Sequence, residues 1–430
     1  MPTADRRLDV VMVGGGMITH DQLLPSIYQL QRLGVVGEIS ICALNGPPLR
    51  ALATSPTLRE AFPRQTFTPY PDFNKVTDEE LFPHLYKEVV GDLPPRQCVV
   101  VAVPDQMHYE VLKVALAADQ HVLCVKPLVL RYEQAVEIEK EAHQRGLVIG
   151  VEYHKRFDDR SLIARHRYRA GQLGELMAGQ SRLVEPWYYR HSNFQNWLTL
   201  KNSDAFTYIG CHYVDLVAFI TGLRPVEVSV YGNVRKFPNG NEAFMWTDGR
   251  VVFENGACLN VLNGLGYLAD GPGGNSQGMR LFCEKGDRGG IIDHSDDFRG
   301  VKHGFDAADG HGYQEPNPDF FRLIDLGGEG LTPVGYGYRS VAYTVNAMAR
   351  VERETAGLAE PQALKKRQAL LQEYDREGIM ATPKNSSYNE LVMEAGRLSI
   401  LHGGRHVVIR YGERPGIAFK NEFEFPNYGD

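Results

Sequence analysis

The side chains best suited to proton transfer in this sequence are His212 and Asp215. They lie three residues apart at the start of an apolar helical stretch, residues 214–220, and positions i and i+3 share one face of a helix. Imidazole titrates near neutral pH, so His212 suits an acid–base role, and Asp215 could orient it or contact a ligand. Tyr208, one helical turn earlier, could reach the same pocket. The competing interpretation of His212 is a core histidine whose hydrogen bonds are satisfied by the protein, and that of Tyr208 is an ordinary packed aromatic.

A glycine turn after the first predicted strand is suited to holding a phosphate. The strand at residues 8–13 runs into Gly14 and Gly16, and a helical pattern follows. Gly14 would allow a tight turn, and Gly16 would let the backbone approach a pyrophosphate at the helix N-terminus. Thr19 stands where the dinucleotide fingerprint G-x-G-x-x-G has its third glycine. A glycine turn with no ligand is therefore the alternative.

The second predicted strand ends at Asn45, where this fold often carries an acidic residue. An acidic side chain there would bond the adenosine ribose and repel a 2′-phosphate. Asn45 can bond the hydroxyls without that repulsion, and Arg50 is near enough in sequence to meet a phosphate. Asn-Gly is also good turn chemistry. The sequence leaves NAD and NADP open and slightly favours NAD.

Strand and helix signals alternate over the first 150 residues. The apolar run at residues 99–103 is typical of a strand buried on both faces of a parallel sheet. This alternation predicts an α/β fold that begins with a doubly wound Rossmann domain, which binds a dinucleotide, over residues 1–150.

The pattern changes after residue 150. Asn255-Gly256 separates two apolar runs, which favours a β-hairpin. Residues 151–430 are therefore predicted to form an α+β domain for substrate binding and oligomerisation, with a large, open, mostly antiparallel sheet. Residues 358–388 are charged and partly helical, and we interpret them as an insertion or outer arm.

Three motifs occur in a fixed order. Val-Ala-Val-Pro-Asp-Gln-Met-His at 101–108 is followed by His-Val-Leu-Cys-Val-Lys-Pro-Leu at 121–128 and Gly-Cys-His-Tyr-Val-Asp at 210–215. They resemble the strand-Pro-Asn/Asp-x-x-His, H-V-x-x-E-K-P and G-x-H-x-x-D motifs of the Gfo/Idh/MocA oxidoreductases. The family's glutamate before Lys-Pro is replaced by Val125, and its aspartate four residues before the histidine by Tyr208.

The resemblance implies an NAD(P)-dependent dehydrogenase acting on CH–OH groups of a sugar, glycoside or cyclic polyol. Lys126 would follow the strand that ends under the nicotinamide and hydrogen-bond the hydroxyl, with His212 as the general base. The expected catalytic residues are Lys126, His212, Tyr208 and Asp215. The expected cofactor contacts are Gly14, Gly16, Met17, Ile18, Asn45, Val103, Pro104, His108, Lys126, Pro127 and Arg156. The expected substrate contacts are Lys126, Glu152, His154, Tyr208 and His212.

Two other functions fit the same residues. A glycosidase that keeps NAD bound would oxidise a sugar hydroxyl transiently, eliminate the aglycone and reduce again. The departures at Val125 and Tyr208 leave room for it. A non-catalytic regulator would use the fold to bind a dinucleotide or sugar, but the presence of both Lys126 and His212 argues against it.

Composition restricts the partners. A net charge of −7 provides no basic field for nucleic acid or an anionic membrane. Apolar runs stay far below the ~18 residues needed to span a bilayer, and no signal peptide is evident, so we expect a cytoplasmic protein.

The six cysteines lack a C-x-x-C pair and are expected to be free and reduced. No spacing predicts a metal site. A homo-oligomer, dimer or tetramer, through the C-terminal sheet is what the resemblance implies.

Overall fold

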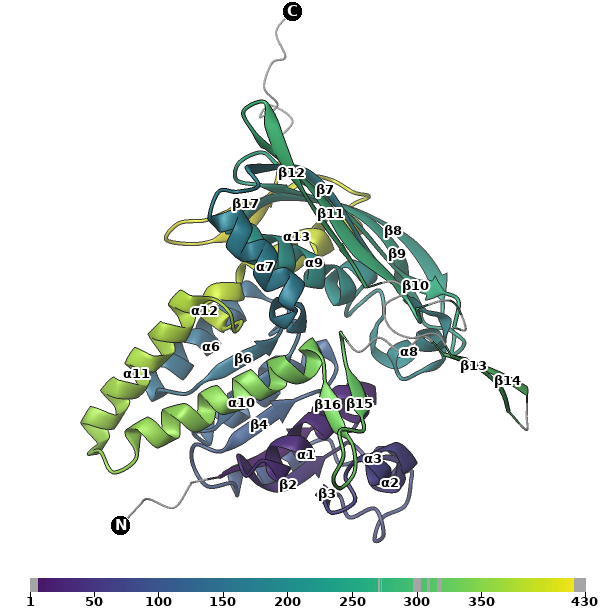
Figure 1. Cartoon of the computed structure of the whole chain (residues 1–430), viewed down its shortest axis with the longest axis vertical. Helices are drawn as coiled ribbons and strands as arrows, with labels where there is room; N and C mark the ends of the chain where they lie inside the picture. Colours follow the sequence, from purple (N-terminus) through teal and green to yellow (C-terminus); the bar gives the residue numbers. More distant parts are fainter. Residues whose placement is uncertain are drawn as a thin grey trace, which may run out of the picture. The chain divides into compact units, whose positions relative to one another are not determined.

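The computed structural model describes residues 7–269, 271, 273–296, 303–307, 310–314 and 319–420. The chain forms two compact units (Figure 1). The N-terminal unit consists of Met1–Val129, Glu133–Asp158 and Pro318–Ser387. The C-terminal unit consists of Leu130–Tyr132, Asp159–Asn317 and Tyr388–Asp430. The units therefore differ from the predicted domains, because the chain returns to the first unit after most of the second.

The N-terminal unit contains the predicted parallel sheet of a Rossmann domain. Its six strands lie in the order β3-β2-β1-β4-β5-β6, and every neighbouring pair is parallel. Strand β4 is a Cys-Val-Val-Val run with all four side chains buried, as expected for a strand covered on both faces. The strands are β1 (Leu8–Val13), β2 (Val36–Cys42), β3 (Thr68–Tyr70), β4 (Cys98–Val101), β5 (His121–Val125) and β6 (Ile149–Glu152).

Helices connect and cover these strands, as the alternating pattern predicted. A five-residue π-helix, η1, follows the glycine turn and leads directly into α1. These elements are η1 (Thr19–Leu23), α1 (Leu24–Arg32), α2 (Gly46–Thr54), α3 (Pro56–Ala61), α4 (Leu85–Gly91), η2 (Asp105–Met107), α5 (His108–Ala117), α6 (Tyr132–Arg145) and η3 (His154–Phe157).

The returning segment completes the core of the N-terminal unit. It contains β15 (Arg322–Ile324), β16 (Thr332–Val334), α10 (Tyr336–Thr355), α11 (Glu360–Glu377) and α12 (Pro383–Ser386). Val341, Val345 and Met348 of α10 belong to the same buried cluster as Leu24 and Ile27 of α1. Each such side chain contributes about 1.5–3 kcal/mol of burial free energy. Leu370 and Tyr374 of α11 belong to this cluster too, so residues 358–388 are not an outer arm.

The C-terminal unit is built on an eight-stranded sheet in the order β12-β11-β7-β10-β9-β8-β17-β18. Only the β7–β10 pair is parallel, so the prediction of a mostly antiparallel sheet is confirmed. The strands are β7 (Glu175–Pro186), β8 (Pro225–Lys236), β9 (Glu242–Phe253), β10 (Cys258–Tyr267), β11 (Ser276–Lys285), β12 (Arg288–Ser295), β17 (Val407–Arg410) and β18 (Gly416–Phe419). A separate ribbon pairs β13 (His303–Ala307) with β14 (Gly310–Gln314).

The hairpin predicted at Asn255-Gly256 joins β9 to β10, and Gly256 has a φ of +86°, which favours glycine. One face of the sheet is covered by helices α7 (Asp159–Arg169), α9 (Cys211–Thr221) and α13 (Tyr388–Leu401) (Figure 1). Along β10, Leu259, Val261, Asn263 and Leu265 are buried, whereas Leu262 is exposed. The side chains therefore alternate between the helix-covered face and an open face.

All six cysteines fall within the described residues and are free thiols, and only Cys258 is not fully buried. Burial raises the pKa of the Cys42 and Cys98 thiols to about 12. No helix within the described parts of the chain has the length and apolar character needed to cross a membrane.

Candidate functional site

The predicted cofactor residues follow neighbouring strands of the N-terminal sheet. Gly14 comes after β1, Asn45 after β2, Val103 after β4 and Lys126 after β5. These strands are adjacent in the order β2-β1-β4-β5, so their carboxyl ends form one edge. The chain order changes direction between β1 and β4, and open α/β sheets bind ligands at such a point.

The glycine turn has the shape that a pyrophosphate needs. Gly14 has a φ of +117°, and a Cβ there would lie 2.0 Å from the backbone oxygen of Ala102. Apart from its chain neighbours, no residue in the described parts of the chain has an atom within 4 Å of a Cβ placed at Gly16, so its surroundings are open. The Thr19 hydroxyl donates a 2.8 Å hydrogen bond to the Gly14 carbonyl and thereby fastens the turn in place of a third glycine. The turn therefore fits a dinucleotide, with Met17 and Ile18 beside it at the helix start.

Arg50 is already engaged near the end of β2. Its guanidinium pairs with the Asp78 carboxylate at 2.8 Å and donates to the Phe73 carbonyl at 3.0 Å. Asn45 is the N-cap residue of α2 in an extended conformation. A cation neutralised by Asp78 is a poor receptor for a 2′-phosphate, which favours NAD over NADP.

His108 does not face the open edge of the sheet. It is fully buried, and its Nδ1 and Nε2 lie 2.7 Å and 2.9 Å from the carbonyl oxygens of Pro127 and Val103. The ring therefore ties the turn after β4 to the turn after β5. That second turn carries half-buried Lys126, whose peptide bond to Pro127 is cis. His108 is thus a positioning residue for the Lys126 turn, and both of its ring nitrogens are occupied by protein.

Glu152, expected to contact substrate, is buried within the N-terminal unit. Its Oε1 accepts hydrogen bonds of 2.5 Å from Gln22 of η1 and 2.5 Å from Ser340 of α10. The Nδ1 of His154 lies 3.9 Å from the same oxygen, and the His154 ring stacks on Tyr336. Burial raises the pKa of Glu152 from 4.5 to about 7, against the lowering effect of both hydrogen bonds.

Replacing Glu152 with glutamine is expected to change how stability depends on pH. The folded protein binds a proton at Glu152 up to about pH 7, whereas the unfolded chain releases it near 4.5. The wild-type free energy of unfolding therefore falls between these pH values, by about 3 kcal/mol in total. Glutamine at position 152 does not titrate, so Glu152→Gln removes this fall. The unfolding free energy of the variant, relative to that of the wild type, should therefore be higher at pH 8 than at pH 5. Urea titrations at both pH values measure it, with exposed Glu88→Gln as the control.

Arg156 is also placed inside the unit rather than at the open edge. Its side chain is among the largest fully buried ones, and its Nη1 donates a 3.1 Å hydrogen bond to the Asn385 side chain. The guanidinium lies 5.8 Å from the Tyr153 ring centroid. Arg156 therefore joins η3 to the returning segment, and the cofactor contact expected for it stays a prediction.

The residues expected to do chemistry in the C-terminal unit share one short segment. Tyr208 lies in the π-helix η5 (Phe206–Gly210), and His212 and Asp215 lie in the first turns of α9. His212 is buried, whereas Tyr208 is half-buried and packs edge-on against Phe194 and Trp197. Single-turn π-helices occur frequently at functional sites.

Asp215 serves the packing of helices. Its Oδ1 accepts hydrogen bonds from the Tyr388 hydroxyl at 2.9 Å and the Asn389 amide at 3.0 Å. Both donors belong to α13, so this buried carboxylate fastens α9 to α13. Asp215 is therefore a positioning residue for the helix that carries His212.

Phe206 anchors the π-helix in the core of this unit. Its ring lies against three glycines, since a Cβ would come within 3.1 Å of it at Gly210, 2.8 Å at Gly249 and 2.4 Å at Gly396. These glycines belong to η5, β9 and α13, so one ring joins the site segment to the sheet and to a helix.

Gly396→Ala is therefore expected to destabilise the protein by about 1–3 kcal/mol, because the added methyl overpacks the Phe206 ring. An alanine in an open helical position would instead stabilise by about 1 kcal/mol. Denaturant unfolding measures the change, with Gly91→Ala, where a Cβ meets open space, as the control. In the Phe206→Leu background the cost should fall, and an unchanged cost would rule out this ring as its source.

The aromatic stretch after β7 divides into two parts. Phe194 and Trp197 of α8 (Phe194–Trp197) pack within 5.0 Å between centroids, and Trp197 is buried. Trp187 and Tyr188 of η4 (Trp187–His191) are exposed, and Arg190 lies 3.8 Å over the Trp187 ring. Core packing accounts for the first part, but it does not account for the exposed rings of the second part.

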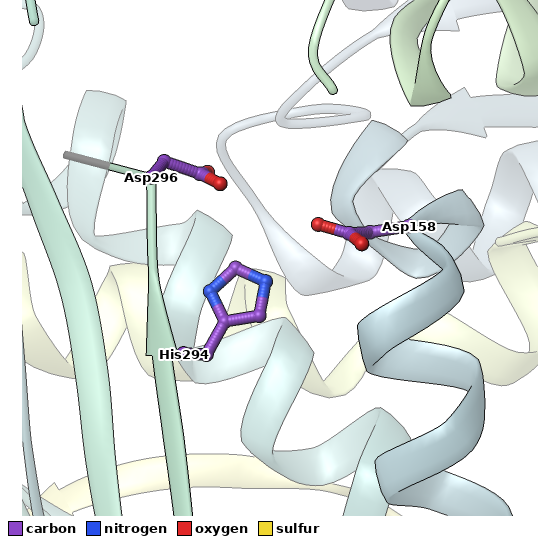
Figure 2. Close-up of side chains that lie close together, drawn as sticks. All are labelled: Asp158, His294 and Asp296. Atoms are coloured by element: carbon purple, nitrogen blue, oxygen red, sulfur yellow. The ribbon is translucent and has the colours of Figure 1, made fainter. Parts of the chain in front are cut away.

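His294 and Asp296 lie two residues apart where β12 ends (Figure 2). Asp296 pairs with Arg160 of α7 at 2.6 Å, and the His294 ring stands edge-on to Tyr213 of α9 at 6.5 Å. Both side chains are buried, so they join the sheet to its helices. Asp158, also labelled in Figure 2, is the last residue of its segment of the N-terminal unit.

Four polar residues near the predicted ones were not predicted from the sequence: Gln22, Ser340, Thr247 and Asn263. One signal was present for Asn263, since it falls in phase with Leu259, Val261 and Leu265 on an otherwise apolar strand face. Gln22 and Ser340 carry no such signal, because their partner Glu152 is 130 and 188 residues away.

Comparison with known proteins identifies the family of this chain. Residues 8–153 match the model of an oxidoreductase family with an NAD-binding Rossmann fold, GFO_IDH_MocA, and residues 162–287 match the GFO/IDH/MocA C-terminal domain. D-glucoside 3-dehydrogenase of Escherichia coli K12 is 29% identical over 30% of this chain and 37% of its own length. The chain spans less than two thirds of the length of such curated relatives, for example 38% and 58% of two uncharacterised oxidoreductases.

Two solved structures share the fold over nearly the whole chain. GenD2 from gentamicin A biosynthesis, solved with NAD, has a TM-score of 0.62 and 17% identity, covering 94% of this chain and 97% of that one. The scyllo-inositol dehydrogenase of Lactobacillus casei, with NAD(H) and scyllo-inositol, has a TM-score of 0.56 and 14% identity, covering 94% and 99%. The chain therefore belongs to the Gfo/Idh/MocA family of oxidoreductases, with an NAD-binding Rossmann domain and the family's C-terminal domain.

Proposed function

We propose that this protein is an NAD-dependent dehydrogenase that oxidises or reduces a secondary alcohol of a sugar, glycoside or cyclic polyol. The observation that carries the proposal is the shared edge of the N-terminal sheet. There, a glycine turn fitted to a dinucleotide follows β1, and Lys126, on a turn tied down by His108, follows β5. A lysine at such an edge is suited to hold the oxygen of an alcohol.

Lys126 and His212 supply the acid–base chemistry in this proposal. When bound, the nicotinamide supplies the acceptor or donor of hydride. The Lys126 ammonium donates a hydrogen bond to the alcohol oxygen and stabilises the charge that develops on it. His212 accepts the hydroxyl proton during oxidation and returns it during reduction. Tyr208 and His154 are proposed as further substrate contacts.

The substrate class rests on the relatives. One is named as a dehydrogenase of D-glucosides, and one structural neighbour holds scyllo-inositol. Both names describe alcohols on a six-membered ring.

We further propose that the protein forms a homo-oligomer, a dimer or tetramer, through the open face of the C-terminal sheet. Exposed apolar side chains occur there on four strands: Tyr231 of β8, Leu262 of β10, Phe282 of β11 and Ile291 of β12. Exposed apolar patches of this kind mark interaction sites. Light scattering of the wild type and of Phe282→Glu tests the oligomer, since the added charge at the interface should reduce the measured molecular mass.

We also propose a cytoplasmic location, supported by the free thiols.

The first test is to denature the purified protein and identify any released nucleotide by spectrum and mass. Added NAD should then bind, and a panel of cyclic polyols, sugars and glycosides should change nicotinamide absorbance at 340 nm. Release of aglycone without net NADH would instead establish the glycosidase alternative. Binding of a sugar without turnover would establish the regulator. Failure to bind either nucleotide would contradict the proposal.

A further inference from the structure

Two buried polar side chains lie beneath the segment that carries Tyr208 and His212. Thr247 of β9 and Asn263 of β10 are direct partners in the antiparallel ladder, so their side chains share a face. That face is the helix-covered one, because Val261 and Leu265, which alternate in phase with Asn263, are fully buried. Asn263 is 0% exposed and Thr247 is 2% exposed.

Neither side chain is satisfied by the protein around it. Within the described residues, both amide atoms of Asn263 and the hydroxyl of Thr247 have no hydrogen-bond partner. Ser181 of β7, a third buried hydroxyl of this sheet, does have one, because its Oγ donates to the Asn260 carbonyl at 3.3 Å. A buried polar group without a partner costs more free energy than an apolar group of the same shape. Such a group in a native protein calls for an explanation.

The amide of Asn263 lies against the main chain of the site segment. A Cβ placed at Gly210 would be 2.8 Å from Asn263 Oδ1, so only glycine lets the two approach. Gly210 ends η5 and is the N-cap residue of α9, two positions before His212. The N–H of Cys211 at this junction points to the Ile209 carbonyl, which is not a regular helical bond. An amide, as both donor and acceptor, is suited to bond main-chain groups at this junction.

We propose that Asn263, with Thr247 beside it, is a positioning residue for His212. Its amide exchanges hydrogen bonds with the main chain around Gly210 when a ligand engages His212, and this sets the place of the imidazole. The Thr247 hydroxyl orients the amide from the neighbouring strand. The catalytic consequence rests on the function proposed above, whereas the structural consequence for His212 does not.

Asn263→Leu separates this role from simple core packing. Leucine has nearly the same shape and removes the unsatisfied amide, so the melting temperature should stay level or rise. The ring resonances of His212 at fixed pH, assigned with His212→Gln in isotope-labelled protein, should shift. With a substrate in hand, kcat should fall at least about tenfold while KM changes less. Thr247→Val should also shift the His212 resonances and lower kcat, but by less. Thr247→Ser keeps the hydroxyl and should behave like the wild type.

Ser161→Ala is the matched control. Ser161 of α7 is another fully buried hydroxyl with no partner among the described residues, and it belongs to the same unit. Ser161→Ala should raise the melting temperature without shifting the His212 ring resonances or changing kcat. If Asn263→Leu leaves the His212 resonances unchanged, the proposal is wrong, whether or not any substrate has been found. Shifted resonances with an unchanged kcat would overturn its catalytic part. If the wild type turns over no substrate, only the proposed function fails.

Discussion

Replacing Lys126 with methionine, or His212 with glutamine, is expected to lower kcat by about 10²–10⁴-fold while NAD binding stays within about twofold of the wild type. Each change removes one proton-handling group and leaves the glycine turn intact. Steady-state kinetics on the substrate found in the polyol and sugar panel, with NAD titration by fluorescence, measures both quantities.

Two exposed residues provide matched controls, Lys140→Met on α6 and His166→Gln on α7. Both should leave kcat unchanged. A loss of only a few-fold in Lys126→Met or His212→Gln would remove that residue from the acid–base chemistry. An equal loss of NAD affinity would show that the residue acts through the cofactor site instead.

Gly14→Ala is expected to weaken NAD binding by at least about 100-fold, or about 2.7 kcal/mol. The new Cβ would stand 2.0 Å from a backbone oxygen, and φ at this position is +117°, so the turn has to change shape. Gly91→Ala, where a Cβ meets nothing within 4 Å, should bind NAD like the wild type. Isothermal titration measures the affinities.

Gly16→Val keeps this prediction testable if Gly14→Ala does not fold. Since a Cβ at Gly16 meets no atom within 4 Å among the described residues beyond its chain neighbours, a valine should leave stability nearly unchanged. The side chain would still occupy the space that a pyrophosphate needs. A folded Gly16→Val protein with wild-type affinity would place the cofactor elsewhere.

Local patterns predicted the fold well because they depend on near neighbours. Alternating strand and helix signals produced the Rossmann sheet, and Asn255-Gly256 located the β9–β10 hairpin. Helix α10 shows what local patterns cannot predict. Its apolar face, with Val341 and Val345, is visible in the sequence, but periodicity does not tell which of two cores that face will join.

The same limit applies to the candidate site. Gly14 and Lys126 were predicted from strand ends and motifs, and the strand order places both turns along one edge of the sheet. The ligand contacts of Asp215 and Glu152 stay predictions, but their hydrogen bonds to Tyr388, Gln22 and Ser340 could not be predicted from the sequence. Asp215 and Tyr388 are 173 residues apart, so only the tertiary structure reveals the pair.

The return of the chain to the N-terminal unit has a consequence for biosynthesis. Helix α10 supplies Ser340 to Glu152 and buried side chains to the first core, but it is translated after every strand from β7 to β16. When the first 158 residues of the nascent chain have emerged from the ribosome, the strands β1–β6 are therefore present without helix α10, which packs against them in the folded protein. We expect that sheet to reach native stability only once residue 387 has emerged, so the two units mature together although one begins at the N-terminus.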